Sequence, residues 1–159
     1  MSLISREITG KETELMAAVS RSKNSPRSLN ALGVLYARYD LSDKAEAQFQ
    51  MAVKTAEYVP ALVNLGTLRF RDARPDDAIA YYERAYKQAP HDPLVLLGLA
   101  RANHELQNYG AVKKQYEELR SLSPELANQF AYLRLQGEES TRAAESSQAG
   151  GIMVWEEEK

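Results

Sequence analysis

Apolar side chains recur three and four residues apart along most of the chain, which is the spacing of one face of an α-helix. Segments with this spacing predict three helix pairs, at about 27–39 with 42–55, 60–72 with 75–88, and 93–106 with 109–121. No window alternates apolar and polar residues for long enough to indicate a β-sheet. The pattern therefore predicts an all-α protein.

Two further helices are expected to cover the ends of these pairs. Leu15 and Val19 lie on one side of a segment that predicts a flanking helix within residues 1–25. Apolar residues around Phe130 predict a capping helix at 124–137. Without such helices, the ends of the stack would expose apolar surface to water.

The helix pairs also repeat in sequence, because Leu32, Leu65 and Leu99 begin the same pattern at spacings of 33 and 34 residues. A glycine in a helix interior costs on the order of 1 kcal/mol relative to alanine, so its reuse at Gly33 and Gly66 predicts close helix packing. The corresponding sets are Leu32, Gly33, Tyr36, Ala45, Phe49 and Ala52; then Leu65, Gly66, Arg69, Ala78, Tyr82, Ala85 and Pro90; then Leu99, Ala100, Asn103, Val112, Tyr116, Leu119 and Pro124.

This recurrence resembles the tetratricopeptide repeat family, whose unit of about 34 residues has Leu-Gly on its first helix and Ala, an aromatic residue and Ala on its second. The segment from Asp76 to Ala85 is an especially close match. The resemblance implies a right-handed superhelix of helix pairs. Its expected parts are an amino-terminal flanking helix (1–25), three repeats (26–58, 59–92 and 93–123), a capping helix (124–137) and a flexible acidic tail (138–159).

The resemblance further implies that the first helices line a concave groove that holds a segment of another protein. Asn64 matches a position where many peptide-binding members have an asparagine that bonds the ligand backbone. The groove residues expected on this basis are Asn30, Val34, Arg38, Val63, Asn64, Thr67, Phe70, Arg71, Leu97, Arg101 and His104. Arginines around apolar side chains suit a ligand with apolar anchors and acidic ends.

One well-known binding mode of the family is not expected. Its two-carboxylate clamp, which recognises chaperone tails, needs lysine and arginine where this chain has Asn30, Val34, Leu94 and Gly98. We therefore do not predict that the groove recognises a chaperone tail.

The chain ends in a short apolar cluster followed by acids. Residues 138–151 are rich in Glu, Ser, Ala and Gly, which predicts disorder. The cluster after them is either a solvated terminus or a tethered ligand for the groove of the same or a neighbouring molecule. Its residues are Ile152, Met153, Val154, Trp155 and Glu156. Charge favours the second alternative weakly, because residues 1–137 carry 18 basic and 16 acidic side chains and 138–159 carry 2 and 6.

The composition argues against several other classes of protein. The 159-residue chain has no cysteine, a net charge of −2, and no apolar run near the ~20 residues that a membrane span requires. We therefore expect a soluble, cytoplasmic protein that has no membrane span and binds no nucleic acid.

Catalysis and metal binding have little support in the sequence. His91 lies in a linker between prolines and is expected to be solvated, whereas His104 is expected to bond a partner. Asn108 stands where a zinc-binding helix would need a second histidine. There is no glycine-rich phosphate loop and no nucleophile motif. We predict a non-enzyme with no catalytic residues, no metal and no cofactor.

Three functional hypotheses follow. The first is an adaptor or scaffold that binds an extended or helical segment of another protein in the groove. The second is a self-associating module whose tail fills its own groove or that of a neighbour in a homo-oligomer. The third is a chaperone of the type III secretion kind, because three repeats with an amino-terminal helix in about this length resemble those proteins.

Overall fold

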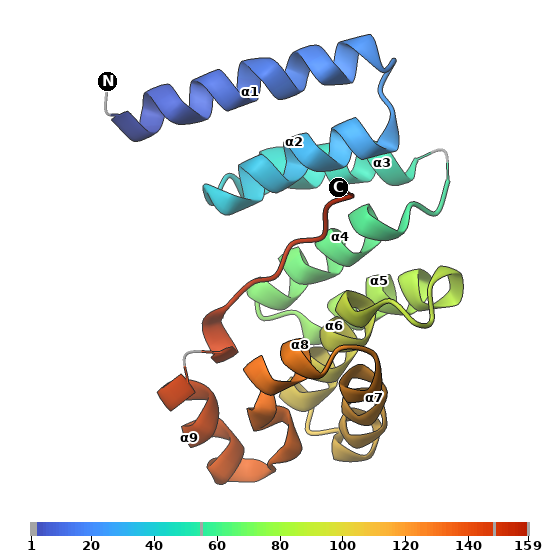
Figure 1. Cartoon of the computed structure of the whole chain (residues 1–159), viewed down its shortest axis with the longest axis vertical. Coiled ribbons are helices and arrows are strands. Elements are labelled where there is room, and N and C mark those ends of the chain that lie inside the picture. Colours follow the sequence, from blue (N-terminus) through green and yellow to red (C-terminus); the bar gives the residue numbers. More distant parts are fainter. Residues whose placement is uncertain (1–2, 55, 148, 159) are drawn as a thin grey trace.

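The computed structural model describes residues 3–54, 56–147 and 149–158, and every regular element among them is a helix. In chain order they are α1 (Leu3–Arg21), α2 (Pro26–Arg38), α3 (Ser42–Val53), α4 (Val59–Arg71), α5 (Pro75–Gln88), α6 (Pro93–Glu105), α7 (Tyr109–Leu122), α8 (Pro124–Gln129), the 3₁₀ helix η1 (Ala131–Arg134), α9 (Gly137–Ser147) and the 3₁₀ helix η2 (Ala149–Gly151). Figure 1 shows them stacked from α1 at one end to α9 at the other. The predicted all-α solenoid is confirmed.

Helices α2 and α3, α4 and α5, and α6 and α7 form three packed pairs, and each pair contacts the next. Their bounds lie within two residues of the predicted ones. Proline begins α2, α5 and α6, where its missing amide hydrogen leaves no helical bond unmade. Sequence periodicity and local helix signals therefore agree with the packing.

The turn inside each helix pair contains a residue in the left-handed backbone conformation. Asp40, Ala73 and Gln107 have φ angles of 58°, 59° and 60°, respectively. These three residues are separated by 33 and 34 positions, so one turn geometry recurs in all three repeats. A left-handed conformation costs a non-glycine residue roughly 1–2 kcal/mol, which the surrounding helix contacts must offset.

Glycines allow aromatic rings to pack directly against helix backbones. A Cβ atom on Gly33 would lie 2.5 Å from the ring of Phe49, and one on Gly66 would lie 2.6 Å from the ring of Tyr82. Gly98 of α6 faces the same Tyr82 ring, which therefore lies between α4 and α6. The repeated glycines thus serve the close packing that their cost in helix propensity predicted.

The two ends of the stack are covered differently. At the amino-terminal end, α1 packs Ile8, Leu15 and Val19 against the core of the first helix pair. At the other end, the single capping helix expected at 124–137 is interrupted at Phe130, where φ is −115° and ψ is 35°. Phe130 is fully buried there, so core packing overrides the continuation of the helix.

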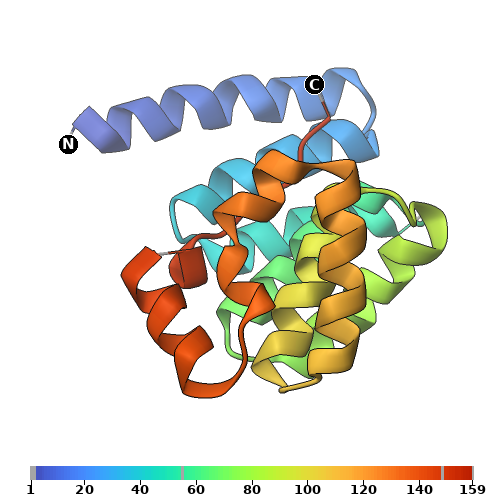
Figure 2. The ribbon, with the colours of Figure 1, turned by 60° about the horizontal axis from the view of Figure 1, so that its bottom comes forward.

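The segment predicted to be disordered is ordered instead, and this prediction is corrected. Residues Gly137–Ser147 form α9, which lies beside η1 at the far end of the stack from α1 (Figure 2). Ser140 is fully buried and donates a hydrogen bond to the carbonyl of Tyr132. The polar composition of this segment did not predict helix α9, because the helix depends on a few contacts with residues elsewhere in the fold.

Candidate peptide-binding groove

The last described residues, 152–158, follow an extended path across the first helices of the repeats, and we call them the terminal segment. Figure 1 shows this segment leaving the neighbourhood of α9, running along α4 and ending near α2. Val154 packs against the core cluster of the third helix pair, and Trp155 packs against that of the first pair. The groove is therefore the surface of α2, α4 and α6 that carries this segment.

Two buried asparagines bind the backbone of Glu156. Asn64 accepts a hydrogen bond from the Glu156 amide at 2.8 Å and donates one to its carbonyl at 2.9 Å. Asn30 donates to the same carbonyl at 2.9 Å and accepts a bond from Asn64 at 2.8 Å. Both asparagines are at most 1% exposed, so their amides depend on these partners for hydrogen bonding. The groove thus satisfies both polar backbone groups of one extended residue.

Arg71 places its charge against the one tryptophan of the chain. Its guanidinium lies 5.4 Å from the centre of the Trp155 ring. The same group donates to the carbonyl of Ala37 at 3.2 Å and to the hydroxyl of Ser42 at 2.6 Å, and it pairs with Asp40 at 3.3 Å. These bonds orient the guanidinium before any ligand arrives, and a cation over an indole ring is attractive.

Arg101 is the most buried arginine of the groove, at 4% exposure. Its guanidinium lies between the rings of Phe70 and Phe130, at 4.7 and 4.9 Å from their centres. It donates to the carbonyls of Ala149 and Gly150, at 3.4 and 3.1 Å. The sequence led us to expect that this arginine would orient an acidic ligand, but it binds the backbone that leads into the terminal segment.

The acidic end of the terminal segment meets arginines at the rim. Arg38 lies 3.6 Å from Glu157, and Arg27 lies 4.0 Å from Glu158. All four side chains are well exposed, so each pair contributes little to affinity. Arg27 was absent from the expected groove because its position falls before the repeated Leu-Gly pattern.

The remaining expected groove residues divide into two groups. Val34, Val63 and Leu97 are buried in the three core clusters beneath the groove and offer it little free surface. Thr67 does not line the groove, because its hydroxyl bonds the Val63 carbonyl and the Tyr82 hydroxyl, each at 3.0 Å, inside the second repeat. The spacing of residues along a helix does not distinguish a side chain that lines the groove from one that packs against the paired helix.

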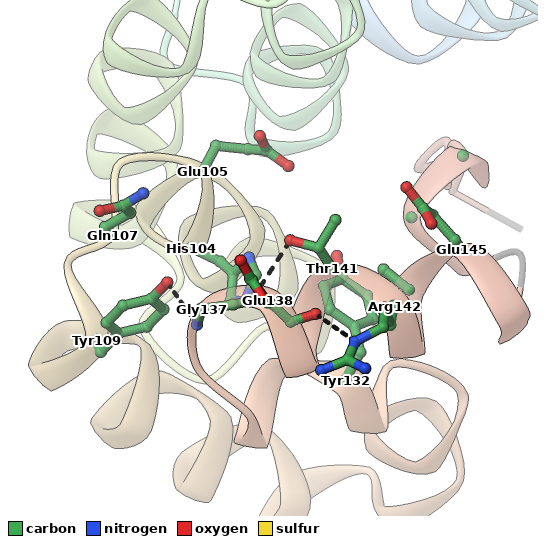
Figure 3. A pocket seen from close by; sticks show the side chains of 13 residues that line it. His104, Glu105, Gln107, Tyr109, Tyr132, Gly137, Glu138, Thr141, Arg142 and Glu145 are labelled. Carbon is green, nitrogen blue, oxygen red and sulfur yellow. Dashed lines mark hydrogen bonds between the residues drawn. The ribbon is translucent and has the colours of Figure 1, made fainter.

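His104 contacts α9 rather than the terminal segment. It lies beside a hollow that is lined by α6, α9, the residues between them and η2 (Figure 3). The volume of this hollow is about 890 Å³. The Nε2 atom of His104 shares a hydrogen bond with Ser140, and its ring makes edge-to-face contacts with Tyr109 and Tyr132. Burial lowers the pKa of His104, which keeps the ring neutral in this setting. Its role here is to hold α9.

The carboxyl group of Glu156 lies in an unfavourable place. It is beside the carboxylate of Asp92, and its Oε2 atom is buried without a hydrogen-bond partner among the described residues. Burial and the neighbouring Asp92 raise the pKa of Glu156 to about 9. Sequence reasoning did not place Asp92 in the site. An aspartate at this position is already explained by capping α6, and Asp92 does cap that helix.

The fold defines a helical-repeat protein, and its groove is occupied by an extended segment of the same chain. Residues 69–137 match the family model of the tetratricopeptide repeat, so this part of the chain is similar to that family, and the three packed helix pairs have the arrangement that the resemblance implies. Such repeats typically form non-catalytic scaffolds for protein interaction. The predicted resemblance is confirmed.

A search of solved structures finds the same fold in the crystal structure of MamA. The TM-score is 0.64 with 17% sequence identity, and the match covers 95% of each chain. No curated protein sequence matches the chain. Among the described helices, none combines the length and apolar character needed to span a bilayer.

Proposed function

We propose that this protein binds an extended segment of a partner protein in the groove over α2, α4 and α6, and that its own terminal segment occupies the groove when the partner is absent. The observation that carries this proposal is the pairing of Asn30 and Asn64 with both backbone groups of Glu156. Backbone bonds of this kind do not depend on which chain supplies the peptide group. A partner segment could therefore replace the terminal segment at the same place.

Side chains on either side of this backbone contact set the chemistry of the ligand. Trp155 supplies an aromatic anchor for Arg71, and Val154 supplies an apolar contact with the third repeat. The acids that follow meet Arg38 and Arg27 at the rim. The preferred ligand is thus an aromatic residue in an extended apolar stretch with acids on its carboxyl side.

Tethering makes the terminal segment a competitor of every partner. Because the terminal segment is covalently joined to the chain that carries the groove, its binding is intramolecular and does not depend on the protein concentration. The segment therefore sets a threshold that a partner must exceed by affinity or by concentration. This arrangement makes the protein a self-blocked adaptor.

A second candidate function is self-association through exchange of terminal segments between two copies. It is favoured by one observation, which is that the groove is occupied by an extended segment of the same chain, residues 152–158. In such a dimer, the Asn30 and Asn64 side chains of one molecule would bind the Glu156 backbone of the other, as in domain swapping. The type III secretion-like chaperone hypothesis stays a prediction.

The experiment uses a fluorescein-labelled peptide of sequence IMVWEEEK and the full chain. Trp155→Ala should weaken the internal competitor, so this variant should bind the labelled peptide more tightly than the natural chain, as measured by anisotropy. Adding Asn64→Ala to Trp155→Ala should weaken this binding about tenfold or more. The matched control is Asn103→Ala, because Asn103 is a buried asparagine of α6 whose bonds go to Leu99 and Gln115.

Light scattering distinguishes the two candidates. A monomer whose peptide binding rises in Trp155→Ala supports internal blocking, whereas a dimer that dissociates in Asn64→Ala supports exchange. If Trp155→Ala and the natural chain bind the peptide equally weakly and both are monomers, the groove proposal is wrong. Circular dichroism melting of each variant separates loss of binding from loss of the fold.

A further inference from the structure

We infer that the groove selects a partner segment in which the aromatic anchor is followed by a neutral residue able to donate a hydrogen bond, such as glutamine. The chain's own Glu156 then makes the terminal segment a displaceable ligand. This inference rests on the proposed function and specifies its ligand.

The backbone of Glu156 cannot shift without loss of its bonds. Asn64 binds both its amide and its carbonyl, and Asn30 binds the same carbonyl. The neighbouring Trp155 is held over Arg71. Because the residue is anchored on its backbone and at the preceding side chain, the direction of the Glu156 side chain is set by the groove rather than by its own charge.

The place to which this side chain is directed is acidic. Asp92 at the start of α6 faces it, and the Asp92 carboxylate accepts a hydrogen bond from the amide of Leu94 at 2.9 Å. That bond makes Asp92 the N-cap of α6 and fixes the position of its side chain. A second carboxylate placed beside it would be repelled.

Other titratable groups around Glu156 do not relieve this repulsion. Glu158 of the same segment adds negative charge, and Tyr58 from the start of α4 faces both glutamates. Arg27 of α2 is the cation on this side, and it pairs with Glu158 at 4.0 Å. Among the described residues no cation pairs with Glu156, and its Oε2 atom has no hydrogen-bond partner.

A neutral amide resolves every one of these conflicts. Glutamine has nearly the shape of glutamate, carries no charge, and can donate from its amide nitrogen to the Asp92 carboxylate. The two adjacent acids are different, because Glu157 and Glu158 each have an arginine within 4.0 Å. The groove therefore prefers a neutral residue at one position and accepts acids at the next two.

The sign of the pH dependence follows from the same contacts. In the free segment Glu156 has its ordinary pKa near 4.5, whereas docking raises the pKa to about 9. Docking therefore takes up a proton at intermediate pH and weakens as pH rises from the first value to the second. Docking of a segment with glutamine at this position has no such dependence.

The test compares three labelled peptides on the full-length Trp155→Ala chain at pH 6 and pH 8.5. They are IMVWEEEK, IMVWQEEK (the E156Q change) and IMVWEQEK (the E157Q change). At the higher pH, the E156Q peptide should bind at least about tenfold more tightly than the natural peptide, since each pH unit of required proton uptake is a factor of about ten. The E157Q peptide should bind equally to the natural one or slightly more weakly.

Asp92→Asn in the same chain provides the matched test on the protein side. Asparagine keeps the N-cap bond but lacks the charge, so the preference for the E156Q peptide should become smaller, and burial of the Glu156 carboxyl should preserve the rest of it. Equal affinity of these two peptides for the chain with Asp92, at both pH values, would overturn the inference while leaving the proposed function intact. If no peptide binds at either pH, the proposed function itself fails.

Discussion

Asn64 both donates to and accepts from the backbone of Glu156, a residue 92 positions later in the chain. This pairing resembles the contact between neighbouring β-strands, but a buried side-chain amide supplies one side of it. Asn64 also donates to Asn30, which makes it the centre of the network.

Removing Asn64 should therefore release the terminal segment more completely than removing Asn30. Asn64→Ala leaves the Glu156 amide without a partner and should weaken docking by about 1–3 kcal/mol. Asn30→Ala removes one of two donors to the same carbonyl and should have a smaller effect. Iodide quenching of Trp155 fluorescence measures the released fraction, and equal quenching in the two variants would contradict this order.

Arg71→Lys should weaken the contact with Trp155 although the charge is kept. Lysine cannot bond Ala37 and Ser42 together while it lies over the indole, so its ammonium is less well positioned. We expect a loss of about 0.5–1 kcal/mol in docking, seen as greater Trp155 quenching.

Arg74→Lys is the control for this change, because Arg74 forms an exposed pair with Asp77 in the neighbouring turn. That variant should leave the quenching of Trp155 at the natural level. A similar rise in both variants would mean that general charge, rather than the position of Arg71, holds the indole.

Gly66→Ala should destabilise the fold. Its new Cβ atom would meet the buried Tyr82 ring at 2.6 Å, and such overpacking costs about 1–3 kcal/mol. Gly110→Ala in α7 is the matched change, because nothing lies within 4 Å of its Cβ position. It should stabilise the protein by up to about 1 kcal/mol through helix propensity. Urea unfolding measures both, and the same sign for the two variants would refute the packing argument.

Ala73→Gly should stabilise the protein even though it removes a methyl group. Ala73 has a φ angle of 59°, which strains a residue with a Cβ atom. Glycine relieves that strain but increases the entropy of the unfolded chain, so we expect a net gain of about 0.5–1 kcal/mol. A lower urea midpoint for this variant would show that the turn is not strained.

Much of the fold was predictable because its cause is local. The spacing of Leu32, Leu65 and Leu99 reports a repeated packing unit, and each unit needs only its neighbours to bury its apolar face. Asn64 was expected in the groove through the family resemblance, because it matches a position where many peptide-binding members have an asparagine. The interruption at Phe130 and the helix α9 were not, because they depend on contacts with distant residues.

The amino-acid order was enough to predict the helix pairs, the glycine and aromatic positions between them, and an apolar and acidic terminus. Only the tertiary structure decided that Arg101 bonds backbone carbonyls, that Thr67 turns toward Tyr82, and that Asp92 lies beside Glu156. Periodicity reports which face of a helix is buried, and it carries no information about which distant group lies opposite. The chemistry of the groove depends on those opposing groups, so it emerged only when the chain was folded.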